Sequence, residues 1–268
     1  MLKPVLGTQL NLGHPLARGL VGCWLMNEGG GNLVADLSGN GNAGTSVDSG
    51  VTWQASRHGT ALHFDGSASY VNCGTDVGID GAREITIVTR YMLDATGSYD
   101  VIAGKYLDST NNISINANTV SGTALSFTVA DGSTNYGWTF AGAVTTGKLY
   151  QISCVFNGYG NGNTERAKIY IDDVNLSLNY TGIIPSAAPS LTSTNFNIGN
   201  TSDTFCFNGL MYYMYVFNRA LTPNDIQSLY MDPYQMLRHD PIELWAAAAA
   251  SAVTDTGIVI LRRRRECA

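Results

Sequence analysis

The sequence is poor in charged residues and has no apolar run long enough to cross a membrane. Charged side chains make up 13% of the 268 residues, about half of the roughly 25% that is usual in globular domains. The longest apolar stretches are far shorter than the roughly 18 residues of a membrane-spanning helix, so we expect no membrane insertion. Residues 1–30 also lack a basic stretch followed by an apolar core and a small-residue cleavage site, and we expect no secretory signal.

Cysteine is present, but without the spacing of a metal cluster. The five cysteines are Cys23, Cys73, Cys154, Cys206 and Cys267, an odd number with no CxxC pair, so neither a metal cluster nor a disulfide framework is predicted. The apolar neighbours of Cys154 in ISCVF are typical of a thiol that acts as a small buried hydrophobe. Buried free thiols fit a protein that folds in a reducing cytosol.

Positive charge is also scarce. Lys and Arg total 15 against 21 for Asp and Glu, a net charge of −6, so the body of the protein should repel a phosphate backbone and we expect no nucleic-acid binding by it. The run from Arg262 to Arg265 is the exception, and two interpretations stay open. It contacts nucleic acid or an acidic partner, or it is a solvated tail or a basic arm docked on a neighbouring copy.

The sequence is rich in short runs of Val, Ile, Tyr, Phe and Thr between clusters of Gly, Asn, Asp and Ser. This pattern predicts an all-β protein, an antiparallel sandwich or barrel of many short strands. FNGYGNGNTERAK at 156–168 is predicted to be a hairpin loop, because Asn and Gly tolerate positive φ. The predicted strands are residues 61–64, 84–93, 124–130, 149–156, 167–173 and 209–217.

One helix is predicted near residue 222. Thr222 is the expected N-cap, Pro223 the first helical residue and Asp225 the partner of a capping box, with Ile226 on the apolar face. Asp232, which precedes a proline, is expected to end the helix. We expect this helix to pack as a lid on the edge of the sandwich.

The two ends lack the strand rhythm of the middle. Residues 1–18 and 233–268 are predicted to be N-terminal and C-terminal arms on either side of one domain at 19–232. The run from Ala246 to Ala250 has high helix propensity but is too short to form a stable helix alone, so we expect the C-terminal arm to order only against a partner or the domain's own surface.

Four segments in a fixed order resemble the concanavalin A-like lectin/glucanase superfamily. The similarity is to the laminin G-like jelly-roll domains of bacterial surface proteins and bacteriophage virion proteins, and the flanking NLGHPLARGL and SLYMDPYQML look most like the phage versions. It implies a jelly-roll sandwich of two antiparallel sheets, with the first and last strands adjacent. The segments are GLVGCWLMNEGGG at 19–31, DLSGNGNAG at 36–44, ALHFDGSASYV at 61–71 and FNGLMYYMYVFNRALTPNDIQSLYMDP at 207–233.

The resemblance also raises the question of a calcium ion at the edge of the sandwich. Many members of this superfamily hold one through carboxylate and backbone oxygens, and here Asp36 would be the ligand with Asn40 as a helper. The last-strand motif of the family usually carries an acid, where this sequence has Tyr212 and Tyr213. We therefore expect no cofactor, with calcium as the alternative and an Asx-turn as the other role of Asp36.

Three aromatic residues in polar, Gly-rich surroundings are candidates for sugar binding. These are Tyr136 and Trp138 in NYGWTF and Tyr159 in NGYGNGN. An aromatic face would stack on the C–H groups of a sugar ring, while Asn135 or Asn161 would hydrogen-bond its hydroxyls. The alternative is that these rings belong to the core.

No catalytic residues are predicted. Glycoside hydrolysis needs two carboxylates across a cleft, and the ExDxxE motif of the superfamily's glucanases is absent. Asp172 and Asp173 are adjacent, so in a strand they would point to opposite faces, and they are predicted to form a hairpin turn. No GxSxG motif accompanies any of the four histidines.

These features predict a non-enzymatic structural, decoration or fibre protein of a phage virion. It would be made in the host cytoplasm, displayed on the particle surface, attached to other virion proteins through its arms and assembled as a homo-oligomer, for example a trimer. Its jelly roll would serve adhesion to host cell-surface glycans. The alternatives are a carbohydrate-binding, lectin-like module of a bacterial or prophage surface protein and, third, a glycoside hydrolase.

Overall fold

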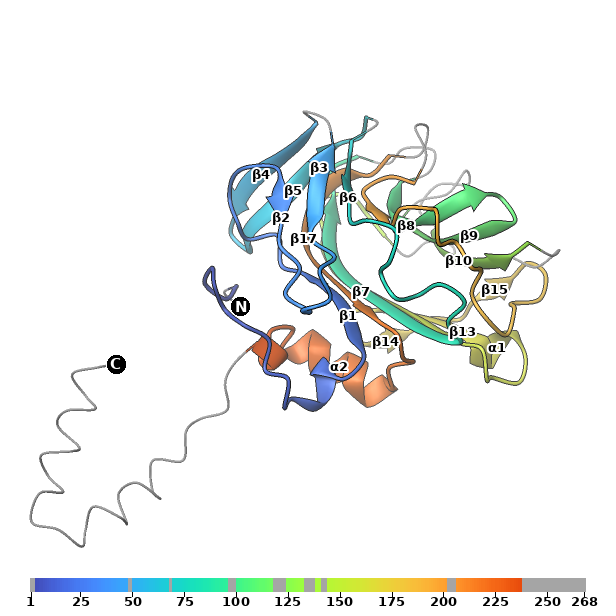
Figure 1. The fold of residues 1–268 in the computed structure, drawn as a ribbon. Helices are drawn as coiled ribbons and strands as arrows, with labels where there is room; N and C mark the ends of the chain where they lie inside the picture. The colour runs from blue at the N-terminus through green and yellow to red at the C-terminus, as the bar shows by residue number, and fades with distance from the viewer. Residues whose placement is uncertain are drawn as a thin grey trace, which may run out of the picture. The chain divides into compact units, whose positions relative to one another are not determined.

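Two antiparallel sheets lie face to face and enclose the core (Figure 1). The computed structural model describes residues 3–47, 50–67, 69–95, 100–117, 124–132, 138–140, 144–201 and 206–237, with the backbone alone at 47 and 138–140. The described part of the chain falls into one compact unit that ends at Leu237. The predicted two-sheet antiparallel sandwich is therefore confirmed.

The eight-stranded sheet has the order β14-β13-β12-β7-β17-β5-β4, and β1 also pairs with β17. Its strands are β1 (Leu20–Trp24), β4 (Val51–Ser56), β5 (Gly59–Asp65), β7 (Glu84–Leu93), β12 (Leu149–Asn157), β13 (Ala167–Ile171), β14 (Val174–Asn175) and β17 (Asn208–Phe217). β5 pairs with the first half of β17 and β1 with the second half. The first and last strands are thus adjacent, as the resemblance implied.

The nine-stranded sheet has the order β15-β11-β10-β9-β8-β16-β6-β3-β2. Its strands are β2 (Leu33–Val34), β3 (Gly44–Val47), β6 (Tyr70–Asn72), β8 (Val101–Asp108), β9 (Asn111–Asn116), β10 (Leu125–Asp131), β11 (Trp138–Phe140), β15 (Asn179–Tyr180) and β16 (Asn197–Ile198). The remaining elements are η1 (Pro15–Ala17), α1 (Asn163–Arg166), α2 (Pro223–Met231) and η2 (Gln235–Leu237).

The core between the sheets is built from alternate residues of the strands. Leu62 and Phe64 of β5 both point into it, because side chains two apart in a strand share a face. Trp24 of β1 stacks on Phe196 with ring centroids 5.9 Å apart. Cys154 is fully buried there, as predicted for a thiol in an apolar strand.

A second apolar cluster covers the outer face of the eight-stranded sheet, the face turned away from the other sheet. β17 contributes Tyr212, Tyr213 and Tyr215, because a bulge between Met211 and Tyr213 turns two successive tyrosines to the same side. The residues of α2, η1 and η2 that pack there are Leu16, Ile226, Leu229, Met236 and Leu237.

The structure corrects the predicted place of the helix. α2 has the predicted capping box, with Thr222 and Asp225 bonded to each other's backbone, and Asp232 is its C-cap. It lies across the outer face of the eight-stranded sheet (Figure 1), however, and not at the sandwich edge. The hydroxyl of Tyr215 donates to the carbonyl of Pro233 at 2.9 Å, which ties the segment after α2 to the sheet.

Residues 3–18, which were predicted as part of an arm, contact the sandwich. Leu16 and Ala17 are buried, and the Asn11 backbone N–H donates to the carbonyl of Met236 at 2.8 Å. The Lys3 ammonium donates to the carbonyls of Leu25, Met26 and Tyr212. None of the described helices is both long and apolar enough to cross a membrane.

Candidate functional site

Asp36 lies beside β1, where it forms an isolated bridge with Trp24. Its Oδ1 accepts the backbone N–H groups of Cys23 and Ser38, both at 2.9 Å. Its Oδ2 accepts the Ser38 hydroxyl at 2.8 Å and the Asn42 N–H at 2.9 Å. The carboxylate is therefore surrounded by donors, and it fastens the loop at 36–42 to the first strand.

Asn40 lies in the same loop and also donates. Its amide nitrogen is 3.3 Å from the carbonyl of Leu20 and 3.1 Å from the Ser38 hydroxyl. A calcium ion needs about six to eight oxygen ligands, and no group of three or more His, Cys, Asp or Glu is arranged to hold a metal in the described ranges. These residues fit a turn better than a calcium ion, and the expectation that no cofactor is bound stays a prediction.

The three aromatic candidates have different outcomes. Tyr136 and Asn135 lie outside the described residues. The backbone of Trp138 begins β11, where it pairs with Phe127 of β10 and Tyr180 of β15. Tyr159 is described in full, and 69% of its surface is exposed. Of the three candidates, only Tyr159 is therefore described together with its surroundings.

Tyr159 lies in the loop between β12 and α1, with a cation against its ring. The guanidinium carbon of Arg83 is 5.3 Å from the ring centroid, close enough for a cation–π contact. The side chain of Asn161, two residues further on, is exposed. Arg83 precedes β7, and nothing in the local sequence pattern predicted that it would lie beside this loop.

The backbone of this loop is held in one conformation by hydrogen bonds. Gly158 donates to the carbonyl of Arg83 at 2.6 Å, and Tyr159 N–H to Asn157 Oδ1 at 3.1 Å. A Cβ on Gly158 would lie 2.0 Å from the carbonyl oxygen of Ser186, so only glycine fits this close approach. Tyr159 is thus an exposed ring on a pre-organised backbone.

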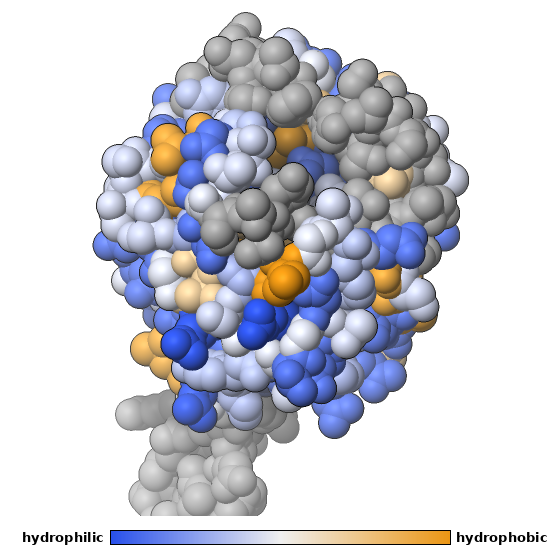
Figure 2. Space-filling model, turned by 90° about the vertical axis from the view of Figure 1, so that its right-hand side faces the viewer, coloured by the Kyte–Doolittle hydropathy of each residue, from blue (hydrophilic) through white to orange (hydrophobic). Residues whose placement is uncertain are grey.

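The side of the molecule where α1 and β15 lie has a mixed surface. Figure 2 shows hydrophobic residues there as small, separate patches among hydrophilic ones. A large apolar patch would be typical of a protein interface. An isolated aromatic ring among amides and charges, as at Tyr159, is instead suited to a ligand that has both C–H and O–H groups.

The described acidic residues do not form an evident catalytic pair. Asp172 and Asp173 form the turn between β13 and β14, as predicted, and Asp172 has a φ of 59°. His63 Nε2 lies 2.9 Å from Asp94 Oδ2 on the outer side of β5, and among the described residues no serine or threonine hydroxyl is hydrogen-bonded to this pair. The sequence-based expectation of no catalytic residues stays a prediction.

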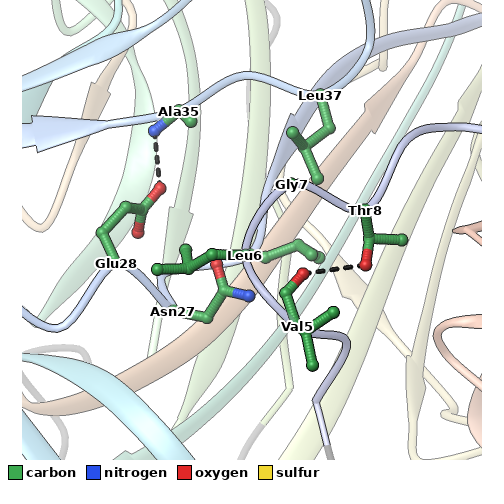
Figure 3. A pocket seen from close by; sticks show the side chains of 9 residues that line it. Val5, Leu6, Gly7, Thr8, Asn27, Glu28, Ala35 and Leu37 are labelled. Atoms are coloured by element: carbon green, nitrogen blue, oxygen red, sulfur yellow. Dashed lines mark hydrogen bonds between the residues drawn. The ribbon is translucent and has the colours of Figure 1, made fainter.

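A small pocket lies between the N-terminal segment and the loop after β1. It has a volume of about 60 Å³ and is lined by Val5, Leu6, Leu25 and Leu37 with polar Asn27 and Glu28 at one side (Figure 3). Glu28 Oε1 accepts the Ala35 N–H at 2.8 Å, while Oε2 is buried with no hydrogen-bond partner. The pocket is too small for a sugar ring.

Comparison with known families supports the fold. The model of a family described as the concanavalin A-like lectin/glucanases superfamily matches residues 65–227, more than half of the chain. No curated protein sequence matches.

The chain is also similar in fold to several solved structures. Domain 4 of the GH43 extracellular arabinanase AbnA from Geobacillus stearothermophilus, in complex with arabinotriose, has a TM-score of 0.59 at 17% identity, over 79% of this chain and 98% of that one. Trypanosoma rangeli sialidase in complex with sialic acid has a TM-score of 0.57 at 13% identity, over 81% of this chain and 33% of that one. The binding domain of botulinum neurotoxin serotype G has a TM-score of 0.56 at 14% identity, over 81% and 51%. At these identities the similarity establishes the fold alone.

Proposed function

Since the chain belongs to the concanavalin A-like lectin/glucanases superfamily, we propose that it is a non-catalytic module that binds glycans through the loop around Tyr159. The observation that carries this proposal is the 69% exposure of a tyrosine ring on a loop fixed by its own hydrogen bonds. A ring held in place before binding loses little conformational freedom when a sugar stacks on it.

The polar groups around the ring supply the second part of a sugar site. Asn161 has an exposed amide that both donates and accepts, and Glu165 Oε2 holds the Asn161 N–H at 2.7 Å. The Arg83 guanidinium lies against one face of Tyr159, which leaves the other for the ligand. The arabinotriose complex of a domain with this fold is consistent with such a role.

The proposal of a non-catalytic module rests on the chemistry of the loop. A glycosidase of the usual kind uses two carboxylates about 5 to 10 Å apart on either side of the scissile bond. Near Tyr159 the described loop has one acid, Glu165, and its Oε2 already accepts a backbone N–H. Binding without cleavage is therefore the activity that these residues favour.

The test compares Tyr159→Ala with wild type on a glycan array, followed by calorimetry on the glycans that bind. We expect Tyr159→Ala to weaken binding about 2- to 12-fold, since a stacking contact of this kind contributes about 0.5–1.5 kcal/mol. Tyr230→Ala, on α2 and away from the loop, is the matched control and should bind like wild type. An array with no binding at all, or equal binding by wild type and Tyr159→Ala, would contradict the proposal. Release of reducing ends from a bound glycan would show a hydrolase instead.

We further propose that this module is displayed on a bacteriophage particle as a homo-oligomer. The proposal rests on the resemblance of the flanking segments and on three exposed apolar side chains in the N-terminal segment, Val5, Leu6 and Leu12, at 78%, 62% and 80% exposure. Exposed apolar side chains are suited to contact with another virion protein. Mass spectrometry of purified particles should detect the chain, and the double variant Leu6→Ser with Leu12→Ser should fold but be depleted from particles. Equal incorporation of this variant would rule out the contact.

A further inference from the structure

A small polar hollow lies on the outer face of the eight-stranded sheet. It has a volume of about 20 Å³ and is lined by His58, Arg90, Tyr212 and Tyr234. It is separate from the Tyr159 loop: Asn157 pairs with Glu84 at the start of β7, and Arg90 lies further along that strand, about 20 Å away at the usual rise of about 3.3 Å per residue.

The lining of the hollow includes a hydrogen-bond donor whose acceptor is not supplied by the protein: Arg90 Nε is buried with no hydrogen-bond partner. Nε2 of Gln151, which is not part of the lining, is also buried without one. Gln151 and Tyr213 are the register partners of Arg90 on the two neighbouring strands, so the three side chains form a row on one face. Gln151 Oε1 accepts the Tyr213 hydroxyl at 2.6 Å, which leaves the amide nitrogen as a donor. Buried donors in native proteins are almost always paired.

Arg57 and Arg90 bring positive charge to the hollow, and no acidic side chain lines it among the described residues. Arg57 Nε donates to His58 Nε2 at 3.0 Å, and Lys3 Nζ is 5.7 Å from the centroid of the Tyr212 ring. Burial, together with the charges of Arg57, Arg90 and the N-terminus, lowers the pKa of His58. In a protein of net charge −6, this is a local concentration of positive charge.

We propose that this hollow binds one carboxylate group, carried by an acidic sugar or by a small organic acid. A carboxylate supplies the acceptor that Arg90 Nε lacks, and its flat shape matches the planar guanidinium fork. A volume of about 20 Å³ is little more than the space of one water molecule, so only the end of the carboxylate enters and the rest of the ligand stays outside. Tyr212 and Tyr234, which are 1% and 4% exposed, also line the hollow.

The first experiment observes the arginine Nε–H signals of the full chain by ¹⁵N NMR during titration with acetate, glucuronate and glucose at constant ionic strength. We expect the Arg90 signal to shift saturably with both carboxylates and not with glucose. Glucuronate binding at least tenfold tighter than acetate assigns the site to acidic sugars, and equal affinities assign it to small organic acids. No saturable shift, or the same shift with glucose, overturns the proposal.

The second experiment measures acetate and glucuronate binding to variants by calorimetry. Arg90→Gln should lose at least tenfold in affinity, while Arg18→Gln, the same charge change at an exposed arginine outside the hollow, should bind like wild type. If far-UV circular dichroism shows that Arg90→Gln is unfolded, Arg90→Lys replaces it and should bind about tenfold more weakly, because lysine lacks the fork. Tyr159→Ala should leave carboxylate affinity unchanged, so failure of this site and failure of the glycan site are distinguishable. Wild-type affinity in a folded Arg90 variant overturns the proposal.

Discussion

At the scale of single residues, the described part of the chain contains one fully buried lysine in an ion pair. Lys105 of β8 is 0% exposed, and its ammonium lies 2.6 Å from Asp80 Oδ2 and 2.7 Å from the carbonyl of Thr75. The other oxygen of Asp80 accepts the Leu191 N–H at 2.9 Å. Because a buried charge without its partner is costly, Asp80 holds three distant segments together.

We therefore expect Asp80→Ala to lower the free energy of unfolding by about 3–5 kcal/mol, the usual effect of removing one member of a buried pair. The double variant Asp80→Ala with Lys105→Met should regain part of that loss, because it removes the uncompensated charge as well. Equilibrium urea unfolding of both variants checks this. A loss below about 0.5 kcal/mol in Asp80→Ala, the range of ordinary surface substitutions, would mean that the pair is not important for stability.

Single residues also show how much of the candidate sites could be predicted from the sequence. Tyr159 was predicted as a ligand residue because an aromatic among Gly and Asn suggests an exposed loop, and it is exposed. Arg83 and Arg90 were not predicted. Their contacts are with residues on other strands, and local patterns carry no information on long-range pairing.

At the scale of elements, the longest strands, β7, β12 and β17, were predicted, but β8 and the short strands were not. The predicted strand at 84–93 coincides with β7, and the capping box of α2 was predicted from Thr222 and Asp225. These signals are local: a run of β-branched and apolar residues, or a cap with its partner three residues on. β2, β14, β15 and β16 have two residues each, too few for a periodic pattern, and they depend on the strand beside them.

The position of α2 was not predictable for a related reason. Ile226 and Leu229 indicate an apolar face, but not what it packs against. The bulge in β17 decides this, because it adds Tyr212 to the outer face beside Tyr213 and creates an apolar surface there. The resemblance led us to expect an acid where Tyr212 and Tyr213 stand, and in the structure these tyrosines belong to the surface that contacts the N-terminal segment and the segment after α2.

At the scale of the whole molecule, the two apolar clusters place many weak acids away from water. Burial raises the pKa of each of these thiols and phenols: Cys23, Cys73, Cys154, Tyr91, Tyr213, Tyr215 and Tyr234. In the unfolded chain they ionise near about pH 8.5 for cysteine and about pH 10 for tyrosine. Their contribution to stability is therefore complete below about pH 8.5 and is lost as the pH rises above the unfolded pKa values.

The buried ammonium of Lys3 has the opposite effect on how stability changes with pH. Burial lowers the pKa of its ammonium to about 7, an effect that the charge of Glu28 partly offsets. Folding therefore becomes more favourable as the pH rises from about 7 towards the unfolded value of about 10.4. Each group changes the free energy of unfolding by about 1.4 kcal/mol per pH unit. Above about pH 8.5 the loss of stability from the three thiols is therefore larger than the gain from the one lysine. Above about pH 10 all seven acids add to that loss.

We expect the protein to unfold cooperatively in alkali, with its buried tyrosines ionising only as it does so. The urea midpoint should fall between about pH 8.5 and about pH 10 and then fall more steeply, because four phenols join the three thiols. Tyrosinate absorbance and far-UV circular dichroism, followed together against pH, check this: the buried tyrosines should give a separate step in absorbance that coincides with the loss of the sheet signal. Alkylation of the thiols in the unfolded state, followed by the same pH titration, measures how much the thiols contribute to the pH dependence of stability. If all the tyrosines ionised smoothly near pH 10 while the sheet signal persisted, the outer-face cluster would have to be open to water, and the closed arrangement of β17, α2 and the N-terminal segment would be wrong.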